Sequence, residues 1–478
     1  MLLSSPRSAV FLDQDKEIYH QEPRRPAAIQ LPNRWLGLIF VVAIVHGLLY
    51  AFLIPPWQAP DEIAHFEYSR LLADHWRPLS KADASPALER EIIASLYRYQ
   101  AWELIGLPTP EEQPAGLNKV PFFLTSRTLD RFSLAYVPYA LAVWPLLTRD
   151  IITQLYIMRC VSVLLGAMVV VLAFQTAQLI EPQSSELAIG TALFLIFLPQ
   201  HTFILASVSD GNLAEFLASI VIYLLLKMLR GGFTWLSALL SLILTFLAVL
   251  AKPTAYFLIP LIVISLPSLR YRKNDLAKIQ GWQIRGLIVL LGAAVLLTAW
   301  GMTQASFIRR FERVLNVWNR LDHFIAVVNS QGHFSLPYAV WGAFQSFWLN
   351  FGWMTLTLPE TGYYALLVFS ILAVVGLVAY FRTRPDRSDQ TLFFVLGLAA
   401  GLPIVIIFAG FFVSTYGLYV YQGRYLFGGI VPLALILVTG WLSLAPRRYA
   451  PWALWALTAG LLLLDVVSFG LIISFYYT

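Results

Sequence analysis

Residues 55–66 read PPWQAPDEIAHF and follow directly on the first long apolar run of the chain. The end of a predicted membrane span is therefore followed closely by an acidic pair, Asp61 and Glu62, and a histidine, His65. Pro60 ends an extended segment, which leaves Asp61 well placed to cap a following helix. Asp61 and His65 are four residues apart on that helix and share one face.

Two roles for Asp61 follow from this pattern. A carboxylate at a helix N-terminus is favoured in its charged form, so we expect Asp61 to be ionised near neutral pH, as a general base must be. In the simpler interpretation Asp61 is only a helix cap and Glu62 only a solvated acid of the first turn. Both interpretations fit the stretch taken alone.

The composition indicates an integral membrane protein. Only 13% of the 478 residues are charged, the mean hydropathy is +0.69, and apolar runs of about 20 residues recur along the chain. The net charge is +6, with Lys and Arg mainly in short loops, which is the positive-inside pattern and not a nucleic-acid footprint. The single cysteine, Cys160, excludes an intrachain disulfide.

The short apolar run 134–147, which contains Pro138 and Pro145, decides the predicted topology. If it does not span, the twelve Lys and Arg of the later short loops join the five of the N-terminal tail in the cytoplasm. The charge rule favours that choice, so we expect 134–147 to be a helix lying on or in the outer leaflet. The twelve are Lys227, Arg230, Arg270, Arg272, Lys273, Lys278, Arg285, Arg382, Arg384, Arg387, Arg447 and Arg448.

The predicted fold is an all-α polytopic membrane protein with about 11 transmembrane helices and a long helical first outer loop. The N-terminus is cytoplasmic and the C-terminus lies outside. We expect a cytoplasmic tail (1–34), the first transmembrane helix (35–54), the first outer loop (55–151), helices two to seven (152–303), an aromatic-rich second outer segment (304–361) and helices eight to eleven (362–478). The spans are 35–54, 152–179, 187–206, 213–229, 233–251, 254–266, 284–303, 363–381, 392–413, 425–444 and 452–475.

Four polar groups fall on the outer side, each where an apolar run meets the surface. Ionisable residues at such depth are usually paired and mark functional sites. The groups are Asp61 and Glu62 with His65; Ser207 to Asn212 with Asp210; Lys252 with Pro253; and Gln422, Arg424 and Tyr425.

Each group also has a simpler interpretation. Asp210 can cap the fourth span, Lys252 can snorkel, and Arg424 can be the structural partner of an acid. Arg159, within the second span, is expected to make structural hydrogen bonds, and His201 is more typical of a satisfied core histidine than of a base.

The convergence of two acids and two cations on one face suits transfer of a sugar from a polyprenyl phosphate. Negative charge develops on the phosphate as the bond breaks, so Arg or Lys must hold it. The incoming hydroxyl needs a positioned base, for which a carboxylate is suitable. A single displacement would invert the anomeric centre. Asp61 as base with Arg424 and Lys252 as the phosphate clamp meets these needs.

At these residues the sequence resembles the GT-C superfamily of membrane glycosyltransferases. The shared plan is an acidic pair opening the first outer loop (Asp61, Glu62), an outer-leaflet helix (134–147) and a second Asp after the third span (Asp210). More closely, it resembles an uncharacterised bacterial family of predicted membrane proteins. The marks of that family are P-x-Q-A-P-D-E-x-x-H-F at 56–66, Pro199-Gln200, Lys252-Pro253, the FWxxFGW pattern at 347–353 and QGRY at 422–425.

The resemblance implies a plasma-membrane glycosyltransferase of GT-C type, acting on the outer face. Its partners would be membrane lipid, a polyprenyl-phosphate sugar donor and a glycan, lipid or protein acceptor of the cell envelope. The expected catalytic residues are Asp61, Glu62 and Asp210; the expected substrate-binding residues are His65, Lys252, Gln422, Arg424 and Tyr425. A divalent metal held by Asp61, Glu62 and Asp210 is possible but not favoured. The alternatives are a flippase of lipid-linked glycans and a non-catalytic subunit of an envelope assembly complex.

Overall fold

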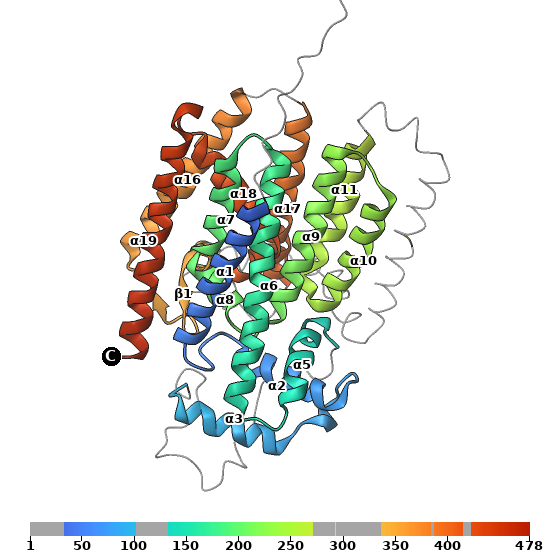
Figure 1. The fold of residues 1–478 in the computed structure, drawn as a ribbon, viewed down its shortest axis with the longest axis vertical. Helices are drawn as coiled ribbons and strands as arrows, with labels where there is room; N and C mark the ends of the chain where they lie inside the picture. The colour runs from blue at the N-terminus through green and yellow to red at the C-terminus, as the bar shows by residue number, and fades with distance from the viewer. Residues whose placement is uncertain (1–32, 102–131, 271–291, 293–335, 384–386, 414–421) are drawn as a thin grey trace, which may run out of the picture.

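A computed structural model describes residues 33–101, 132–270, 292, 336–383, 387–413 and 422–478. They form a bundle of long helices with shorter helices gathered at one end (Figure 1). Residues 1–32 of the expected tail, nearly all of the expected span 284–303 and residues 304–335 of the second outer segment lie outside the described ranges.

Among these residues, six helical segments are long and apolar enough to cross a membrane, and a bent pair makes up to seven. The six comprise α1 (Asn33–Leu53), α6 (Ile151–Ile180), α9 (Asp210–Gly231), α16 (Glu360–Thr383), η11 (Gly423–Gly429) with α18 (Ile430–Leu442), and η12 (Arg447–Tyr449) with α19 (Ala450–Tyr476). Shorter apolar stretches lie in α10 (Trp235–Ala251), in η7 (Pro253–Phe257) with α11 (Leu258–Arg270), and in α17 (Arg387–Val413). The helical membrane fold is therefore confirmed, whereas the count of eleven is not.

The chain bends within the expected span 187–206. α7 (Ser185–Ile196) and α8 (Pro199–Leu205) meet at 63°. Pro199 has no N–H, so the carbonyl of Leu195 loses its helical donor. His201 Nδ1 lies 3.1 Å from that carbonyl oxygen, and Thr202 Oγ1 donates to the carbonyl of Ile196 at 2.8 Å. These side chains satisfy backbone groups that lipid could not.

Glycines allow α16 and α18 to pack closely. A Cβ atom added at Gly440 would overlap the carbonyl of Ala373, and one added at Gly376 would overlap the carbonyl of Gly440. Small residues at helix crossings are the usual device for close packing in membranes, where the hydrophobic effect does not draw helices together.

A buried polar cluster joins the first and last long helices. His46 Nε2 and the hydroxyl of Tyr50, both on α1, lie 2.9 and 2.8 Å from the carboxylate oxygens of Asp465 on α19. Ser468 Oγ is 2.5 Å from the Tyr50 hydroxyl. All four side chains are buried, so the acid is compensated by hydrogen bonds within the bundle.

The first outer loop folds into short helices packed together at one end of the bundle (Figure 1). In chain order they are α2 (Glu62–His75), η1 (Lys81–Asp83), α3 (Pro86–Arg98), η5 (Leu134–Tyr136), α5 (Val137–Val143) and η6 (Trp144–Leu146). The apolar run 134–147 is helical from Leu134 to Leu146 as expected, with a 3-10 turn at each end of α5. α5 packs against both α2 and α6.

After residue 335 the chain departs from the all-helical expectation. α15 (Leu336–Trp348) is followed by a small antiparallel hairpin of β1 (Asn350–Phe351) and β2 (Leu356–Thr357). In its register Asn350 faces Thr357 and Phe351 faces Leu356. The FWxxFGW pattern therefore ends α15 and forms the first strand and turn of the hairpin.

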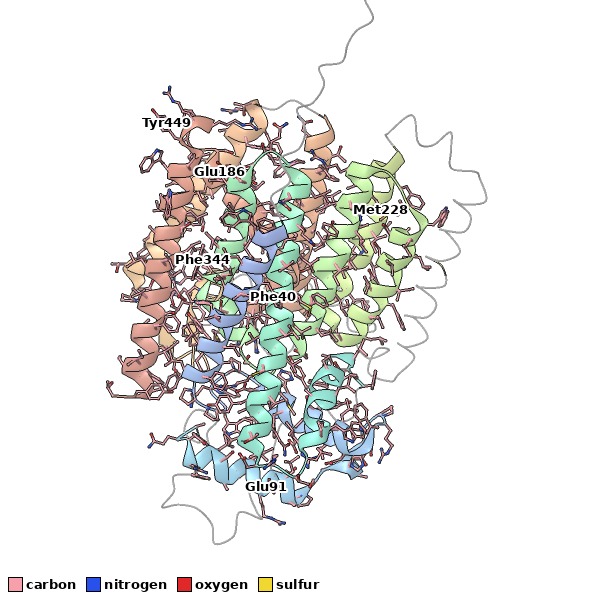
Figure 2. All side chains as sticks on the ribbon, in the orientation of Figure 1. Phe40, Glu91, Glu186, Met228, Phe344 and Tyr449 are labelled. Atoms are coloured by element: carbon pink, nitrogen blue, oxygen red, sulfur yellow. The ribbon has the colours of Figure 1, made fainter. Side chains whose placement is uncertain are left out.

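The described basic loops lie at the opposite end from the short helices. Arg447 pairs with Glu181 at 2.6 Å, and Arg230 donates to the carbonyl of Ile180, so the ends of α6 and α9 meet the start of α19. Figure 2 shows Tyr449 and Glu186 at this end and Glu91 of α3 at the other. Arg230 and Arg447, from two of the loops expected to be cytoplasmic, therefore lie at the end opposite α3.

Candidate active site

Asp61 and Arg424 form an ion pair at the end of the bundle that carries the short helices. Arg424 Nη2 donates to Asp61 Oδ2 at 2.6 Å, and Nη1 donates to the carbonyl of Pro60 at 3.2 Å. The Arg424 side chain is only 8% exposed, whereas that of Asp61 is 44% exposed. A buried cation thus holds a carboxylate that a substrate can still approach.

The expected helix cap at Asp61 is wrong. α2 begins at Glu62, and the Asp61 side chain makes no capping hydrogen bond. Asp61 has a left-handed backbone conformation, with φ 63° and ψ 4°. Aspartate tolerates this conformation better than most residues, although it remains a costly one of the kind found at functional sites. The turn directs the carboxylate to Arg424 and away from the helix N-terminus.

The charge state of Asp61 is set by two opposing effects. Burial raises its pKa, but the nearby Arg424 guanidinium and, to a smaller extent, His65 outweigh burial and hold the pKa below its usual value. Asp61 is therefore ionised at neutral pH, although by ion pairing and not by the helix-end effect that the sequence suggested.

A second ion pair lies beside the first. Lys252 Nζ donates to Asp210 Oδ1 at 2.6 Å, with the side chains 17% and 26% exposed. Ser209, and not Asp210, caps α9, since its hydroxyl accepts from the N–H of Gly211. Lys252 ends α10 at the break before Pro253. Asp210 is thus no cap, and the Lys252 ammonium is paired with a carboxylate.

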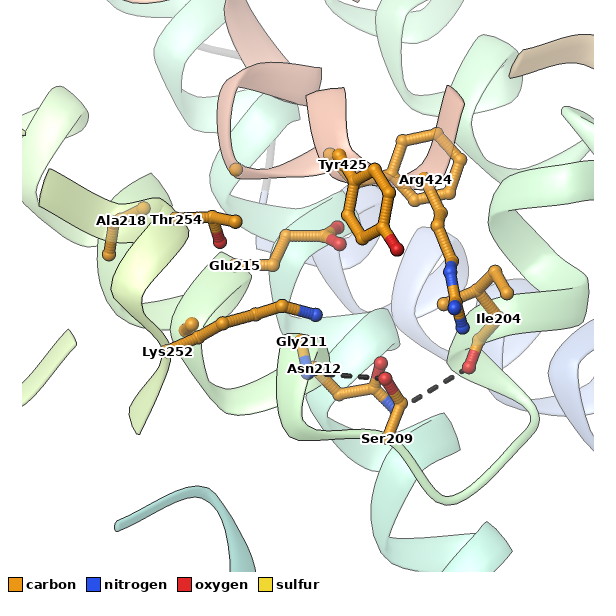
Figure 3. A pocket seen from close by; sticks show the side chains of 14 residues that line it. Ile204, Ser209, Gly211, Asn212, Glu215, Ala218, Lys252, Thr254, Arg424 and Tyr425 are labelled. Carbon is orange, nitrogen blue, oxygen red and sulfur yellow. Dashed lines mark hydrogen bonds between the residues drawn. The ribbon is translucent and has the colours of Figure 1, made fainter. Parts of the chain in front are cut away.

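A narrow cavity of about 20 Å³, enough for roughly one water molecule, opens behind these cations. Figure 3 shows Glu215 of α9, Lys252 and Tyr425 turned toward a common space. The polar side chains lining it include Ser209, Glu215, Lys252, Thr254, Arg424 and Tyr425. The small residues Gly211, Ala214 and Ala218 form the α9 wall. Two cations and a carboxylate therefore face one small polar space.

The cavity carboxylate, Glu215, is held by His201. His201 Nε2 lies 2.7 Å from Glu215 Oε1, and both side chains are buried. The carbonyl at His201 Nδ1 can only accept, so Nδ1 carries hydrogen. One further proton must then lie between Nε2 and Oε1, on either the imidazole or the carboxyl group. The pair is neutral overall, which is how an acid is tolerated at this depth.

The QGRY sequence is positioned by close contact with α15. The N–H of Gly423 donates to Ser346 Oγ at 2.8 Å, and a Cβ atom at position 423 would overlap the backbone of Phe347. Arg424 and Tyr425 follow directly. The Tyr425 ring lies 5.5 Å from Arg424 Cζ and 5.9 Å from Lys252 Nζ, measured to its centroid. Tyr425 thus stands between the two cations.

Two expected site residues differ in their surroundings. Gln422 Nε2 donates to Met354 Sδ at 3.2 Å, so its amide contacts the turn after β1. His65 lies in the charged cluster, where its Nε2 is 3.9 Å from Asp210 Oδ1 and its Nδ1 is 2.9 Å from the hydroxyl of Tyr136.

Glu62 points away from the cluster, to Arg159 of α6. Its two oxygens accept from Arg159 Nε and Nη2 and from the N–H groups of Trp57 and Val208, at 2.7–3.2 Å. Arg159 also donates to the carbonyls of Ala51, Ile54 and Pro55, which close α1. The structural role expected for Arg159 is thus supported, and Glu62 is its partner.

The donor set expected for a metal does not fit one. Glu62 is saturated by four donors, and Asp61 and Asp210 are each ion-paired with a cation. Within the described ranges, no three His, Cys, Asp or Glu side chains converge as metal ligands.

Two residues of this cluster, Glu215 and Tyr136, were not predicted from the sequence. Glu215 could have been found as an acid near the start of the apolar run 213–229, five residues after Asp210. Nothing in the local pattern singles out Tyr136, because its partner is 71 positions away.

Comparison with known proteins gives a family match and a similar structure. Residues 44–437 match the family model described as "Predicted membrane protein (DUF2142)". No curated protein matches the chain. The chain is similar to the crystal structure of ArnT from Cupriavidus metallidurans bound to undecaprenyl phosphate, with 13% identity and a TM-score of 0.49, covering 93% of this chain and 76% of that one.

Proposed function

The chain belongs to the DUF2142 family of predicted membrane proteins, and we propose that it is an inverting glycosyltransferase using a polyprenyl-phosphate sugar. It would transfer the sugar to a glycan, lipid or protein of the cell envelope on the outer face of the plasma membrane. The observation that carries this proposal is the half-exposed Asp61 carboxylate held at 2.6 Å by the buried Arg424, with Lys252 and Asp210 beside it.

In this mechanism the acceptor hydroxyl attacks the anomeric carbon and gives its proton to Asp61. The bond from that carbon to the phosphate oxygen breaks, and its electron pair stays on the phosphate. Arg424 and Lys252 hold the negative charge that develops there. The base takes a proton and forms no bond to the sugar, so the anomeric centre inverts.

The resting ion pairs suit this role. In the free protein each cation is neutralised by an acid, which limits the cost of burying the charges. A bound phosphate would compete for Arg424 and Lys252 and so free Asp61 to accept a proton. Among the described residues, buried Arg424 Nε has no hydrogen-bond partner, so it can donate to a bound ligand.

The outer-face assignment rests on charge distribution. The site lies at the bundle end opposite Arg230 and Arg447, and basic loops favour the cytoplasm. The acceptor and sugar would therefore meet on the far side, where envelope glycans are assembled.

The two alternatives are less well supported. A flippase calls for ionisable groups that face a path through the membrane. His46 and Asp465 lie within α1 and α19, but they are buried and hydrogen-bonded to each other. A non-catalytic subunit would direct its acids into protein contacts. Glu62 fits that description, whereas Asp61 does not.

The test is transfer by the purified protein in liposomes. Undecaprenyl-phosphate-linked glucose, mannose and galactose would be supplied with an envelope extract as acceptor, and release of undecaprenyl phosphate followed. We expect release with at least one donor, and its loss in both Asp61→Ala and Arg424→Ala. Release that persists fully in Asp61→Ala contradicts its role as base.

A further inference from the structure

His65 stands between a hydroxyl donor and two carboxylates. Its Nδ1 is 2.9 Å from the Tyr136 hydroxyl, and its Nε2 is 3.9 Å from Asp210 Oδ1. The His65 and Tyr136 side chains are buried, and Tyr68 packs on Tyr136 with ring centroids 4.4 Å apart. The two rings are therefore held in place, with Nδ1 of His65 hydrogen-bonded to Tyr136 and Nε2 on the side of Asp210.

These partners select one tautomer of His65. Among the described residues, the only hydrogen-bond partner of the Tyr136 hydroxyl is His65 Nδ1, so the phenol hydrogen is satisfied only by donation to that nitrogen. Nδ1 must then lack hydrogen, which places the proton of a neutral ring on Nε2. The surroundings of Nε2 favour the same tautomer, because Nε2 faces the acidic Asp210, beside which an N–H is favoured.

The electrostatics around His65 keep the ring neutral. Burial lowers its pKa, and Lys252 and Arg424 add to that effect, while Asp210 and Asp61 oppose it without reversing it. Burial likewise raises the pKa of Tyr136, so the phenol keeps its hydrogen. Together with Tyr68, these are the charged and titratable residues that face His65 within the described part of the chain.

We propose that Tyr136 is a positioning residue that fixes the Nε2–H tautomer of His65, so that His65 donates this hydrogen to the phosphate of the lipid-linked donor. The 3.9 Å gap from Nε2 to Asp210 is too long for a direct hydrogen bond and leaves the N–H available to a ligand oxygen. The proton stays on Nε2 throughout. The phosphate role rests on the proposed function, whereas the tautomer does not.

The tautomer is tested by magic-angle-spinning NMR of the full chain in lipid bilayers, labelled with ¹⁵N-histidine. The chain has seven histidines, and the His65→Gln variant identifies the His65 signals. We expect hydrogen on Nε2 and a hydrogen-bonded Nδ1 without hydrogen. Tyr136→Phe should abolish this single form, whereas Tyr68→Phe, which keeps the ring stack, should preserve it. Hydrogen on Nδ1 in the natural protein overturns the proposal without needing any variant.

The phosphate contact is tested by titration. Undecaprenyl phosphate should shift the Nε2 signal. The same titration with inorganic phosphate separates recognition of the phosphate from recognition of the lipid. An unchanged Nε2 signal at saturating undecaprenyl phosphate contradicts the contact. In the transfer assay Tyr136→Phe should lower kcat about tenfold with little change in KM. If no donor reacts even in the natural protein, the proposed function fails, while the tautomer result stands independently.

Discussion

Arg424 Nη2 lies 2.6 Å from Asp61 Oδ2, although 363 positions separate the two residues in the chain. The contact joins the turn after the first long helix to the segment that enters α18. The Arg424 side chain is buried and the Asp61 side chain is half exposed. The cation is therefore fixed in place, while the carboxylate is accessible to a substrate.

Replacing Asp61 by asparagine should reduce transfer at least about 100-fold, because the amide cannot accept the proton of the acceptor hydroxyl. Arg424→Lys should also be impaired, since an ammonium cannot reproduce the fork that binds Asp61 and the Pro60 carbonyl. Asp74→Asn is a matched control, because Asp74 lies on α2 and, within the described part of the chain, pairs with the neighbouring Arg70 alone. Equal losses in Asp74→Asn and Asp61→Asn would mean that α2 itself had been disturbed.

Replacing Glu62 by alanine should destabilise the fold by about 3–5 kcal/mol, the usual cost of leaving one partner of a buried ion pair uncompensated. The Arg159 and Glu62 side chains are 1% and 0% exposed, and Arg159 also holds the end of α1. Tryptophan fluorescence during thermal unfolding measures the change. Glu62→Gln should lose less, since its carbonyl still accepts from Arg159. An unfolding temperature unchanged in Glu62→Ala, with transfer lost, would instead support a catalytic Glu62.

Stability should fall as pH rises, through Glu67 on α2. Glu67 is buried, and neither of its oxygens has a hydrogen-bond partner among the described residues. Burial, together with Glu89, raises its pKa from 4.5 to about 8. The folded protein therefore prefers the neutral acid. Its stabilising effect is complete below pH 4.5 and is lost progressively as pH rises toward 8, by at most about 1.4 kcal/mol per pH unit.

Glu67→Gln removes this dependence. Its unfolding temperature should exceed that of the natural protein by a margin that widens from pH 5 to pH 8 and then levels off. In Glu89→Gln the fall in unfolding temperature should level off at a lower pH, because removal of the neighbouring negative charge lowers the pKa of Glu67. If the unfolding temperatures of the natural protein and of Glu67→Gln changed in parallel with pH, Glu67 would be ionised in the folded protein.

Gly423→Ala should abolish transfer without changing any charge. The added methyl group would overlap the backbone of Phe347, so the QGRY segment must shift and carry Arg424 away from Asp61. Gly397→Ala on α17 is the control, because a Cβ atom there meets nothing within 4 Å. Transfer measured alongside the amount of folded protein separates displacement from unfolding. Normal transfer in Gly423→Ala would show that the segment moves freely.

Much of the site could be predicted because its residues interrupt apolar runs. Asp61, Asp210, Lys252 and Arg424 each stand where a run meets a surface, and the positive-inside rule placed them at one end. The structure brings all four together. The family resemblance read from residues 56–66 and 422–425 is likewise confirmed by the match over 44–437.

The pairings themselves could not be predicted from the sequence. Glu62 and Arg159 are 97 positions apart, and Asp210 and Lys252 are 42 apart, so no helical spacing connects them. The cap expected at Asp61 failed because tertiary attraction to Arg424 overrode a local preference. The bend at Pro199 was not predicted. The side chains of His201 and Thr202 replace the lost backbone hydrogen bonds, and in the sequence both look like ordinary interior residues.

The Asp465 cluster bears on how the protein is made. His46 and Tyr50 leave the ribosome early, but their acidic partner is on the last helix, 419 and 415 positions later. Throughout synthesis the first helix therefore carries two polar groups whose partners do not yet exist. The polar groups of α1 can be buried against Asp465 only once α19 has been inserted beside them.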